Sequence, residues 1–474
     1  MLCDLQGREA RGLEVQQEYG QHVHHEAKAE IDADQLARLV IRCLVALVRL
    51  AGPRRADRIA AVGVSTFWHG LVASDDSKRA LTPIYLWSDV RSSSAMEAMR
   101  ERFDAEDVRL RTGCPLHPSY WPSKLRWLRE ERPDLWRRPV KWLSFGDLLF
   151  WRLFGRLGTS LSMASGTGLF RLGDCRWDDE LLVELRVEPG SLPPLAKAEQ
   201  GLKPPYARLL PQLAEKPWLH AVGDGALANL GTGCTSTTDR AITVGTSGAL
   251  RVMHGNSVPG LPRGLWRYRL DETRFLTGGA LSNGGNLRHW LLTNFLIPDR
   301  LDARFRHAAP GAHGLTFLPH LFGERSLGYA ANAFGAVAGL TSATTADDMA
   351  QAAYEAVAVQ FAQIDRKLDE ILPGARRLVA SGTALLNSPA WMQMMADATG
   401  RPTAASRVKE ASSRGAALFA MEWLGIDRHA AHESGAVKVF RPRRKNSTAY
   451  REIEARQSAL YQVLITDRIL DCLR

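Results

Sequence analysis

The chain has 474 residues, which is too long for one ordinary domain, so we expect two large lobes. Hydrophobic residues make up 45% of the sequence and charged residues 24%, a globular composition that excludes disordered and fibrous classes. The net charge of +10 raises nucleic-acid binding as a hypothesis, but the arginines are scattered and the densest basic run, 441–445, is short. We therefore predict no nucleic-acid partner, and a basic surface is equally compatible with attraction of small anionic substrates.

Cysteine spacing and hydropathy exclude further classes. The six cysteines are dispersed without a C-x-x-C pair, which argues against a disulfide framework and against a zinc site. The first residues lack the basic-then-apolar pattern of a secretion signal. The most apolar early run, 39–51, contains Arg42 and Arg49 and is too short to span a membrane. We expect a cytoplasmic protein without a membrane segment, and we assign no residue as a metal ligand.

The first half of the chain begins with residues 1–7, which resemble half of a hairpin. A helix is predicted over 32–50, with Asp32 as its cap and apolar residues on one face. Residues 59–64 are predicted to form a buried strand. Residues 143–154 are predicted to form a helix that carries Asp147 on an otherwise apolar surface.

In the second half, short strands close on glycines and are followed by long helices. Strands are predicted over 218–222, 241–244, 275–277 and 377–380, and helices over 283–295, 346–372, 388–400 and 412–424. Thr345 and Asp348 form a capping box before the helix from Ala346. Alternation of strands and helices predicts the α/β class. A lobe boundary is expected near 231–239, and a helical tail from Asn446.

Two strand–turn segments carry the strongest chemical pattern. Residues 220–231 predict a strand, a glycine turn and a helix start, with Asp224 at the turn. Residues 241–249 predict a strand that breaks into a Gly-Thr-Ser-Gly turn. A carboxylate aimed at a hydroxyl, beside glycine turns with accessible N–H groups, suits phosphoryl transfer. The alternative is that Asp224 only caps its helix.

Further segments follow in a fixed order along the chain. They are Gly63-Val-Ser-Thr-Phe-Trp-His-Gly70, Leu86-Trp-Ser-Asp-Val-Arg-Ser92, Ser381-Gly-Thr-Ala-Leu-Leu-Asn-Ser388, and Gly335-Ala-Val-Ala-Gly-Leu340 with the capped helix to Glu355. Together they resemble the FGGY family of carbohydrate kinases, most closely its gluconokinase-like and xylulokinase-like members. The resemblance runs from Asp4 to about Phe440. The family's N-terminal signature is close over 124–131, although Trp121 stands where a small residue is usual.

The resemblance implies two actin-like (ribonuclease-H-like) α/β lobes with a cleft between them, in which ATP binds. We expect lobes at 1–232 and 233–445 and a helical tail at 446–474. The implied reaction is ATP-dependent phosphorylation of a sugar hydroxyl, on a sugar acid such as gluconate or on a ketose or polyol. ATP with Mg²⁺ and the sugar are the expected partners, and a homodimer is compatible with the family. The sequence does not fix which sugar is used, because pocket shape and a few contacts decide it.

The resemblance also implies roles for single residues. Asp224 stands where the family has its catalytic base. Gly245, Thr246 and Ser247 match the second phosphate loop, and His69, Trp87 and Asp89 match the segments that grip the sugar. Gly382, Thr383 and Ala384 match the adenosine loop, where a glycine is usual at Thr383. The alternatives are that Trp87 is a core residue, Asp89 pairs with Arg91 on the surface, and His69 is a buried, satisfied histidine.

One departure from the family concerns the start of the sequence. The family opens with a strand ending in an Asp-x-Gly-Thr type loop, whose carboxylate and N–H groups serve Mg²⁺ and phosphate. Here Met1 falls inside the following strand, so we expect the chain as given to lack this loop. Two explanations remain open: a misplaced start in a kinase lineage, which we favour, or a catalytically inactive relative that binds a sugar or nucleotide. For the chain as given, we expect inefficient catalysis.

Overall fold

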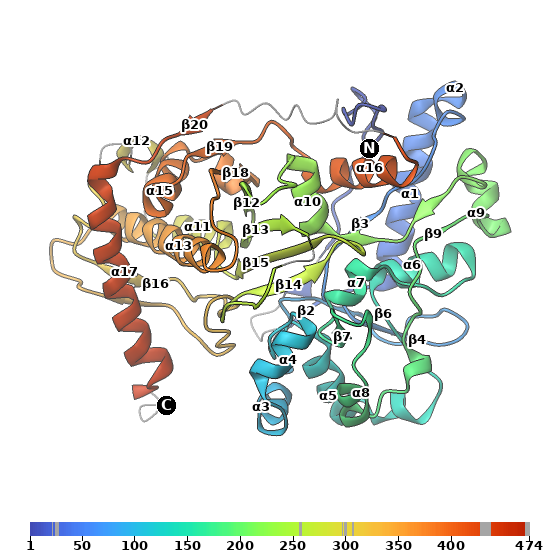
Figure 1. Cartoon of the computed structure of the whole chain (residues 1–474), viewed down its shortest axis with the longest axis horizontal. Coiled ribbons are helices and arrows are strands. Elements are labelled where there is room, and N and C mark those ends of the chain that lie inside the picture. The colour runs from blue at the N-terminus through green and yellow to red at the C-terminus, as the bar shows by residue number, and fades with distance from the viewer. Residues whose placement is uncertain are drawn as a thin grey trace. The chain divides into compact units, whose positions relative to one another are not determined.

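A computed structural model describes residues 1–20, 22–23, 28–255, 258–295, 297, 301–305, 308–426 and 438–469. The chain divides into two compact units (Figure 1). The first unit comprises Met1–Gly233, Arg267–Leu276 and Glu410–Glu433, and the second comprises Cys234–Trp266, Thr277–Lys409 and Ser434–Arg474. Each unit therefore gathers stretches that are separated along the sequence.

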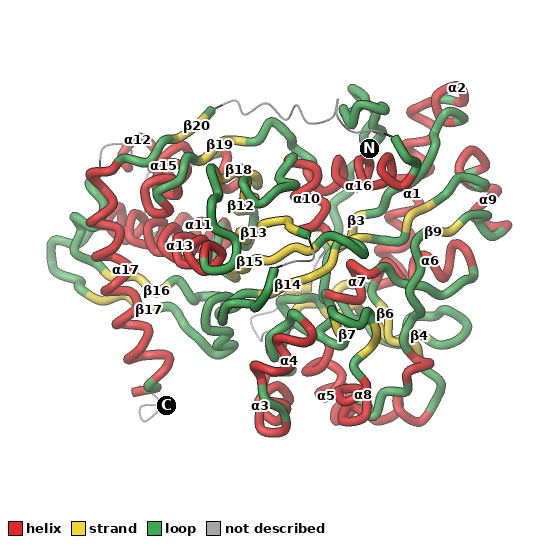
Figure 2. The backbone as a smooth tube through the Cα atoms, viewed as in Figure 1, coloured by secondary structure: helices red, strands yellow, loops and turns green. Residues whose placement is uncertain are grey.

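The first unit combines many helices with short strands (Figure 2). Its described helices are α1 (Ala33–Ala51), α2 (Pro53–Ala56), α3 (Ser93–Arg102), α4 (Ala105–Thr112), α5 (Trp121–Glu131), α6 (Phe145–Phe154), α7 (Leu161–Ser165), α8 (Asp179–Leu185), α9 (Pro204–Leu209), α10 (Asp224–Thr232) and α16 (Ala411–Trp423). Its described strands are β1 (His22–Val23), β2 (Ala29–Ile31), β3 (Ser65–Thr66), β4 (Val72–Ser74), β5 (Ile84–Tyr85), β6 (Lys141–Leu143), β7 (Phe170–Arg171), β8 (Arg176–Trp177), β9 (Ala198–Glu199), β10 (Trp218–Leu219) and β11 (Val222–Gly223).

The predicted start of α1 is confirmed, because the Asp32 carboxylate accepts a hydrogen bond from the Gln35 N–H. The strand predicted over 59–64 is misplaced, since the regular strand here is β3, at Ser65–Thr66. Val62 forms only an isolated bridge to Trp218, and the ladder is interrupted before β3 pairs with β11. The apolar run therefore packs as extended chain, but only its end joins a regular strand pair.

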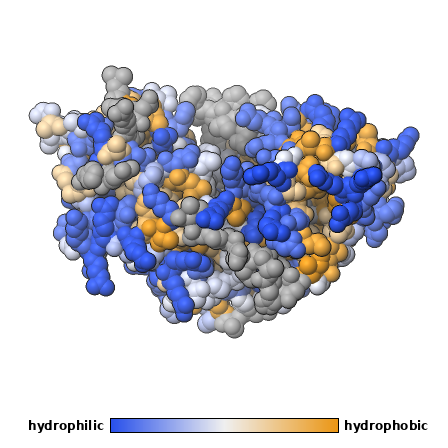
Figure 3. All heavy atoms as spheres, turned by 90° about the horizontal axis from the view of Figure 1, so that it is seen from above, coloured by the Kyte–Doolittle hydropathy of each residue, from blue (hydrophilic) through white to orange (hydrophobic). Residues whose placement is uncertain are grey.

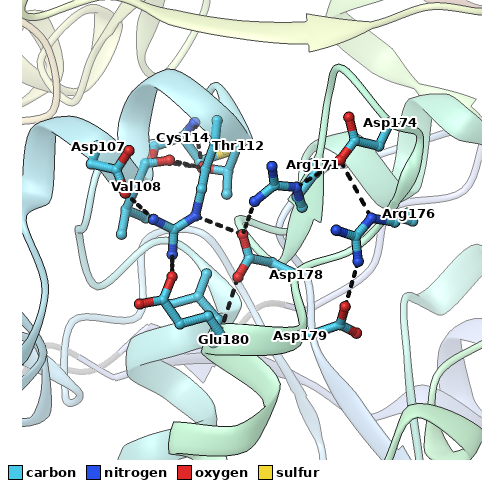
Figure 4. Close-up of polar contacts among 12 residues, drawn as sticks. Asp107, Val108, Thr112, Cys114, Arg171, Asp174, Arg176, Asp178, Asp179 and Glu180 are labelled. Carbon is cyan, nitrogen blue, oxygen red and sulfur yellow. Dashed lines mark hydrogen bonds and ion pairs between the residues drawn. The ribbon is translucent and has the colours of Figure 1, made fainter.

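A buried ion pair fixes the segment that follows α7 (Figure 4). The Arg111 Nε, at the end of α4, donates to the Asp178 carboxylate over 2.7 Å, and the Asp178 side chain is 1% exposed. Asp178 also caps α8 by accepting from the Leu181 N–H. The Leu172 N–H donates to the Arg111 carbonyl. These bonds hold the β7–β8 hairpin against α4, because a buried carboxylate needs both its cation and its hydrogen bonds.

The second unit is built on a sheet with helices packed against it (Figure 1). Its strands follow the order β15-β13-β12-β18-β19-β20, and β12 runs parallel to β18 and antiparallel to β13. Their bounds are β12 (Asp239–Val244), β13 (Gly248–His254), β15 (Phe275–Leu281), β18 (Arg377–Ser381), β19 (Thr403–Ala405) and β20 (Val439–Phe440). β14 (Trp266–Arg269) and the start of β15 lie at the boundary of the units, and β16 (Thr316–Leu318) pairs with β17 (Ala336–Ala338).

The longer described helices of the second unit agree closely with those predicted, and they are α11 (Gly285–Asn294), α13 (Ala346–Asp369), α15 (Pro389–Thr399) and α17 (Ser447–Tyr461). Two short helices, α12 (Leu301–Phe305) and α14 (Thr383–Leu386), were not predicted. The capping box of Thr345 and Asp348 is confirmed, with both reciprocal hydrogen bonds present. Val357, Phe361 and Ile364 of α13 are fully buried in the core of this unit. A buried stripe of this length explains why the longest helix was also the clearest in the sequence.

The surface is mixed in character. Figure 3 shows hydrophobic residues in separate patches among hydrophilic ones on the face that it draws. Within the described part of the chain, no helix combines the length and hydropathy that a membrane crossing requires.

The buried carboxyl of Asp147 provides a test of the first unit's core. Asp147 forms a capping box with Ser144 at the start of α6, and burial raises its pKa to about 6. The folded state therefore holds the proton more tightly than the unfolded chain. The stability that this carboxyl contributes below about pH 4 is lost as the pH rises to about 6. We predict that Asp147→Asn removes this decline. Between pH 4 and pH 7, the unfolding free energy of the variant should therefore fall by about 2–3 kcal/mol less than that of the unchanged chain.

Urea unfolding of both proteins between pH 4 and pH 8 measures this difference. Asp174→Asn is the control, because the Arg171 guanidinium lowers the pKa of this exposed carboxyl, so its contribution changes with pH in the opposite direction. Parallel pH profiles for Asp147→Asn and the unchanged chain would show that Asp147 is ionised in the folded state throughout this range.

Candidate active site

Two parallel strands of the first unit end side by side and carry the predicted catalytic and sugar-binding residues. β3 pairs with β11 in parallel, with Ser65 opposite Val222 and Thr66 opposite Gly223. Beyond the pair, β3 leads into Trp68 and His69, and β11 leads into Asp224. Ligands in α/β proteins bind outside the carboxyl ends of parallel strands. The pairing therefore places Asp224 and His69 at the same edge.

Asp224 is the exposed member of an otherwise buried segment. It is the first residue of α10, and residues 225–232 of this helix are all buried. Gly223 is the N-cap and makes no side-chain capping bond, while the Asp224 carboxylate accepts from the Gly225 N–H over 2.8 Å. The helix start favours a negative charge at this position. The carboxylate thus lies at the helix end without being its N-cap, which weakens the alternative that it only caps α10.

His69 lies in an aromatic cluster at the same edge. The residue is 6% exposed, and its backbone has a φ of 67°, an unusual conformation for a histidine. Its Nδ1 lies 2.6 Å from the Gly166 carbonyl, so this nitrogen carries a proton and donates. The ring contacts Tyr120 and Tyr268, whose hydroxyls lie 2.6 Å apart. Backbone strain together with a fixed tautomer is a combination found at functional sites.

The other two predicted sugar-binding residues follow β5. The antiparallel bridge between Leu71 and Tyr85 leads toward His69 on one strand and toward half-buried Trp87 on the other. Asp89 is buried, and its carboxylate accepts from the Arg91 guanidinium and from the Ala29 N–H. The alternative pairing of Asp89 with Arg91 is therefore present, although the carboxylate is buried. A sugar hydroxyl that binds Asp89 would share the carboxylate oxygens with Arg91 and Ala29.

Glycine turns at one sheet edge form the corresponding region of the second unit. β12 and β18 are parallel neighbours, with Thr243 opposite Ser381, so the turn Gly245–Ser247 and the turn that starts at Gly382 lie at adjacent strand ends. Gly382 has a φ of 87°, and a Cβ there would lie 2.4 Å from the Val244 carbonyl oxygen. Thr246 and Thr383 are exposed. Only a glycine allows this close backbone approach.

A third glycine turn joins these two and was not singled out from the sequence. The Gly285 N–H donates to the Gly245 carbonyl over 2.8 Å, and the Asn286 N–H donates to the Thr246 carbonyl over 3.0 Å. A Cβ on Gly285 would also meet the Ala384 side chain at 2.9 Å. The signal was the Gly284-Gly285 pair between a strand and a helix, as at the other two turns. Three turns from β12, β15 and β18 thus form one backbone-lined surface, which suits phosphate.

Comparison with known proteins agrees with this arrangement. Residues 4–231 match the N-terminal domain, and residues 240–422 the C-terminal domain, of the FGGY family of carbohydrate kinases. The gluconokinase of Bacillus subtilis (strain 168) is 27% identical over 409 residues, which cover 83% of this chain and 79% of that protein. A glycerol kinase of Aromatoleum aromaticum is 29% identical over 438 residues, which cover 88% and 87%.

Solved structures show the same relationship. The ligand-bound xylulose kinase from Lactobacillus acidophilus superimposes with a TM-score of 0.89 at 25% identity, and the match covers 98% of this chain and 95% of that one. The predicted α/β fold of the actin-like class is thereby confirmed. The chain belongs to the FGGY family of carbohydrate kinases and is an enzyme that takes ATP as its phosphoryl donor.

Proposed function

We propose that this kinase transfers the γ-phosphoryl group of ATP to a hydroxyl of a sugar acid, with gluconate as the first candidate. The observation that carries the proposal is the exposed carboxylate of Asp224, at the end of β11 and beside the strand that leads to His69. Gluconate is favoured because a gluconokinase is among the most similar curated relatives. Xylulose and glycerol, the substrates named for other relatives, are the alternatives.

Asp224 acts as the base in this proposal. In a loose phosphoryl-transfer transition state, the attacking hydroxyl needs orientation first and loses its proton late. An ordinary carboxylate suffices for this task, and the first turn of α10 favours a negative charge at this position. His69 and Trp87 would bind the sugar, since a ring nitrogen and an indole face suit hydroxyl groups and the apolar face of a sugar. Asp89 would act through Arg91 or share its carboxylate with the sugar.

The nucleotide would lie on the glycine turns of the second unit. Backbone N–H groups and the hydroxyls of Thr246 and Ser247 would bind phosphate, and the turn of Gly382, Thr383 and Ala384 would bind the adenosine. Mg²⁺ is proposed to enter with the phosphates. Within the described residues, no group of three or more His, Cys, Asp or Glu side chains could hold a metal ion. In kinases, Mg²⁺ is usually bound by substrate phosphates, water and one or two carboxylates.

A substrate panel tests the proposal. Formation of ADP is measured with gluconate, xylulose and glycerol, and the phosphorylated product is identified by ³¹P NMR. We expect ADP formation that depends on the sugar and is fastest with gluconate. Faster turnover with xylulose or glycerol than with gluconate would contradict the proposed substrate.

Replacing the base tests its role. We predict that Asp224→Asn lowers kcat about a hundredfold or more, because an amide cannot accept the hydroxyl proton. The KM values for sugar and ATP should change little, since the two side chains have the same shape. Turnover close to that of the unchanged enzyme would leave Asp224 only a structural role at the start of α10.

Removing the histidine tests the sugar site. We predict that His69→Ala raises the KM for the sugar by about tenfold, the cost of one buried hydrogen bond, while the KM for ATP stays within about twofold. His220→Ala is the control, because His220 is equally buried in the first unit but bonds to Glu199 and stacks on Phe150. If both variants alter the two KM values alike, His69 is a structural residue.

A pair of glycines tests the nucleotide turn. We predict that Gly382→Ala raises the KM for ATP at least about tenfold, because the added Cβ would displace the turn from Val244. Gly374→Ala is the matched control, since Gly374 has a similar φ of 90° but nothing within 4 Å of an added Cβ. Equal KM values for ATP in the two variants would separate this turn from nucleotide binding.

A further inference from the structure

The indole of Trp68 is held on two sides within the first unit. Its Nε1 donates to the Ser162 carbonyl over 2.9 Å, and its ring lies 4.9 Å from that of Tyr268. The residue is 6% exposed. An indole has few rotatable bonds, so these contacts fix both its position and its plane.

Two glycines lie directly against this indole. A Cβ on Gly223 would lie 1.9 Å from the Trp68 Cε2, and a Cβ on Gly166 would lie 2.5 Å from its Cδ1. Gly223 has a φ of −61° and a ψ of 134°, which any residue adopts. The absence of a side chain at position 223 is therefore explained by the indole and not by the backbone conformation.

Ser162 links the two residues a second time. Its carbonyl accepts from the Trp68 indole, and its hydroxyl accepts from the Gly223 N–H over 3.2 Å. Gly223 is thus held by packing against the Trp68 indole and by a hydrogen bond to Ser162, which also binds that indole. The next residue along the chain is Asp224, whose side chain is exposed.

We propose that Trp68 is a positioning residue for Asp224, which rests on the proposed role of Asp224 as the base. The indole fixes the Cα of Gly223, and this sets the direction in which the Asp224 carboxylate leaves the strand. Gly166, the other glycine that lies against the indole, accepts a hydrogen bond from His69 through its carbonyl. Trp68 therefore ties the base and the proposed sugar-binding histidine to the same support, so a shift of the indole moves one relative to the other.

A size exchange between positions 68 and 223 tests this proposal. Gly223→Ala should lower kcat by about a hundredfold, because a displacement near 1 Å at a catalytic group costs about that much. Trp68→Leu alone should lower kcat by at least about tenfold, with the KM for ATP within about twofold. In the Gly223→Ala background, however, Trp68→Leu should raise kcat several-fold, since it makes room for the added methyl group.

This reversal of sign is the diagnostic result when kcat is expressed per folded molecule, because a change in the amount of folded enzyme then has no effect on kcat. Trp142→Phe and Trp68→Phe form a matched pair of controls for stability. Trp142 is also buried in the first unit and lies 4.9 Å from another aromatic ring, that of Trp136. When the two variants have the same unfolding midpoint, Trp68→Phe should lower kcat, whereas Trp142→Phe should leave kcat unchanged.

Two outcomes would overturn the proposal. One is a double variant that is less active than Gly223→Ala alone, and the other is equal kcat for the two phenylalanine variants. Asp224→Asn distinguishes this failure from failure of the proposed function. If Asp224→Asn abolishes turnover while the exchange shows no reversal, Asp224 is the base but Trp68 does not position it.

Discussion

The parallel pairing of β3 with β11 is the constraint on which the proposed active site depends. Two residue pairs, Ser65 with Val222 and Thr66 with Gly223, bring together segments that are far apart in the sequence. His69 and Asp224 each follow one of these strands, whereas Trp87 and Asp89 follow β5, which is joined to the segment after His69 by the bridge between Leu71 and Tyr85. The pairing is short, and its surroundings reinforce it: α10 packs on α16, and the Arg414 guanidinium binds the carbonyls of Gly7 and Gly231.

In the second unit, the proposed phosphate site depends instead on the close approach of backbone turns to one another. The turns meet because Gly285 and Gly382 carry no side chain, since a Cβ on Gly285 would lie 2.4 Å from the Gly245 carbonyl oxygen and one on Gly382 would lie 2.4 Å from the Val244 carbonyl oxygen. Their hydrogen bonds connect the ends of β12, β15 and the start of α11. These bonds hold the turns in place before a ligand binds, and such preorganisation suits charge that is spread over phosphate oxygens. In the proposed function, the acid–base chemistry belongs to the first unit and phosphate binding to the second.

Much of this arrangement could be predicted from the sequence, because its signals are local. The capping box before α13, the glycine at each strand end and the carboxylate of Asp224 all lie within a few residues of the element that they mark. The order of these segments then indicated the family. What the sequence could not provide were contacts between distant segments. Three examples depend on tertiary packing: the indole of Trp68 against Gly223, the hydrogen bond from the Ala29 N–H to the Asp89 carboxylate, and the joining of Gly285 to Gly245.

The central claim is that Asp224 faces the acceptor hydroxyl while the glycine turns hold the nucleotide. A crystal structure of the protein with gluconate and a non-hydrolysable ATP analogue tests it most directly. We predict an Asp224 carboxylate oxygen about 2.6–3.2 Å from a gluconate hydroxyl. We also predict phosphate oxygens bonded to the N–H groups of Thr246 and Ser247. A sugar bound away from Asp224, or phosphates that do not touch these turns, would contradict the account.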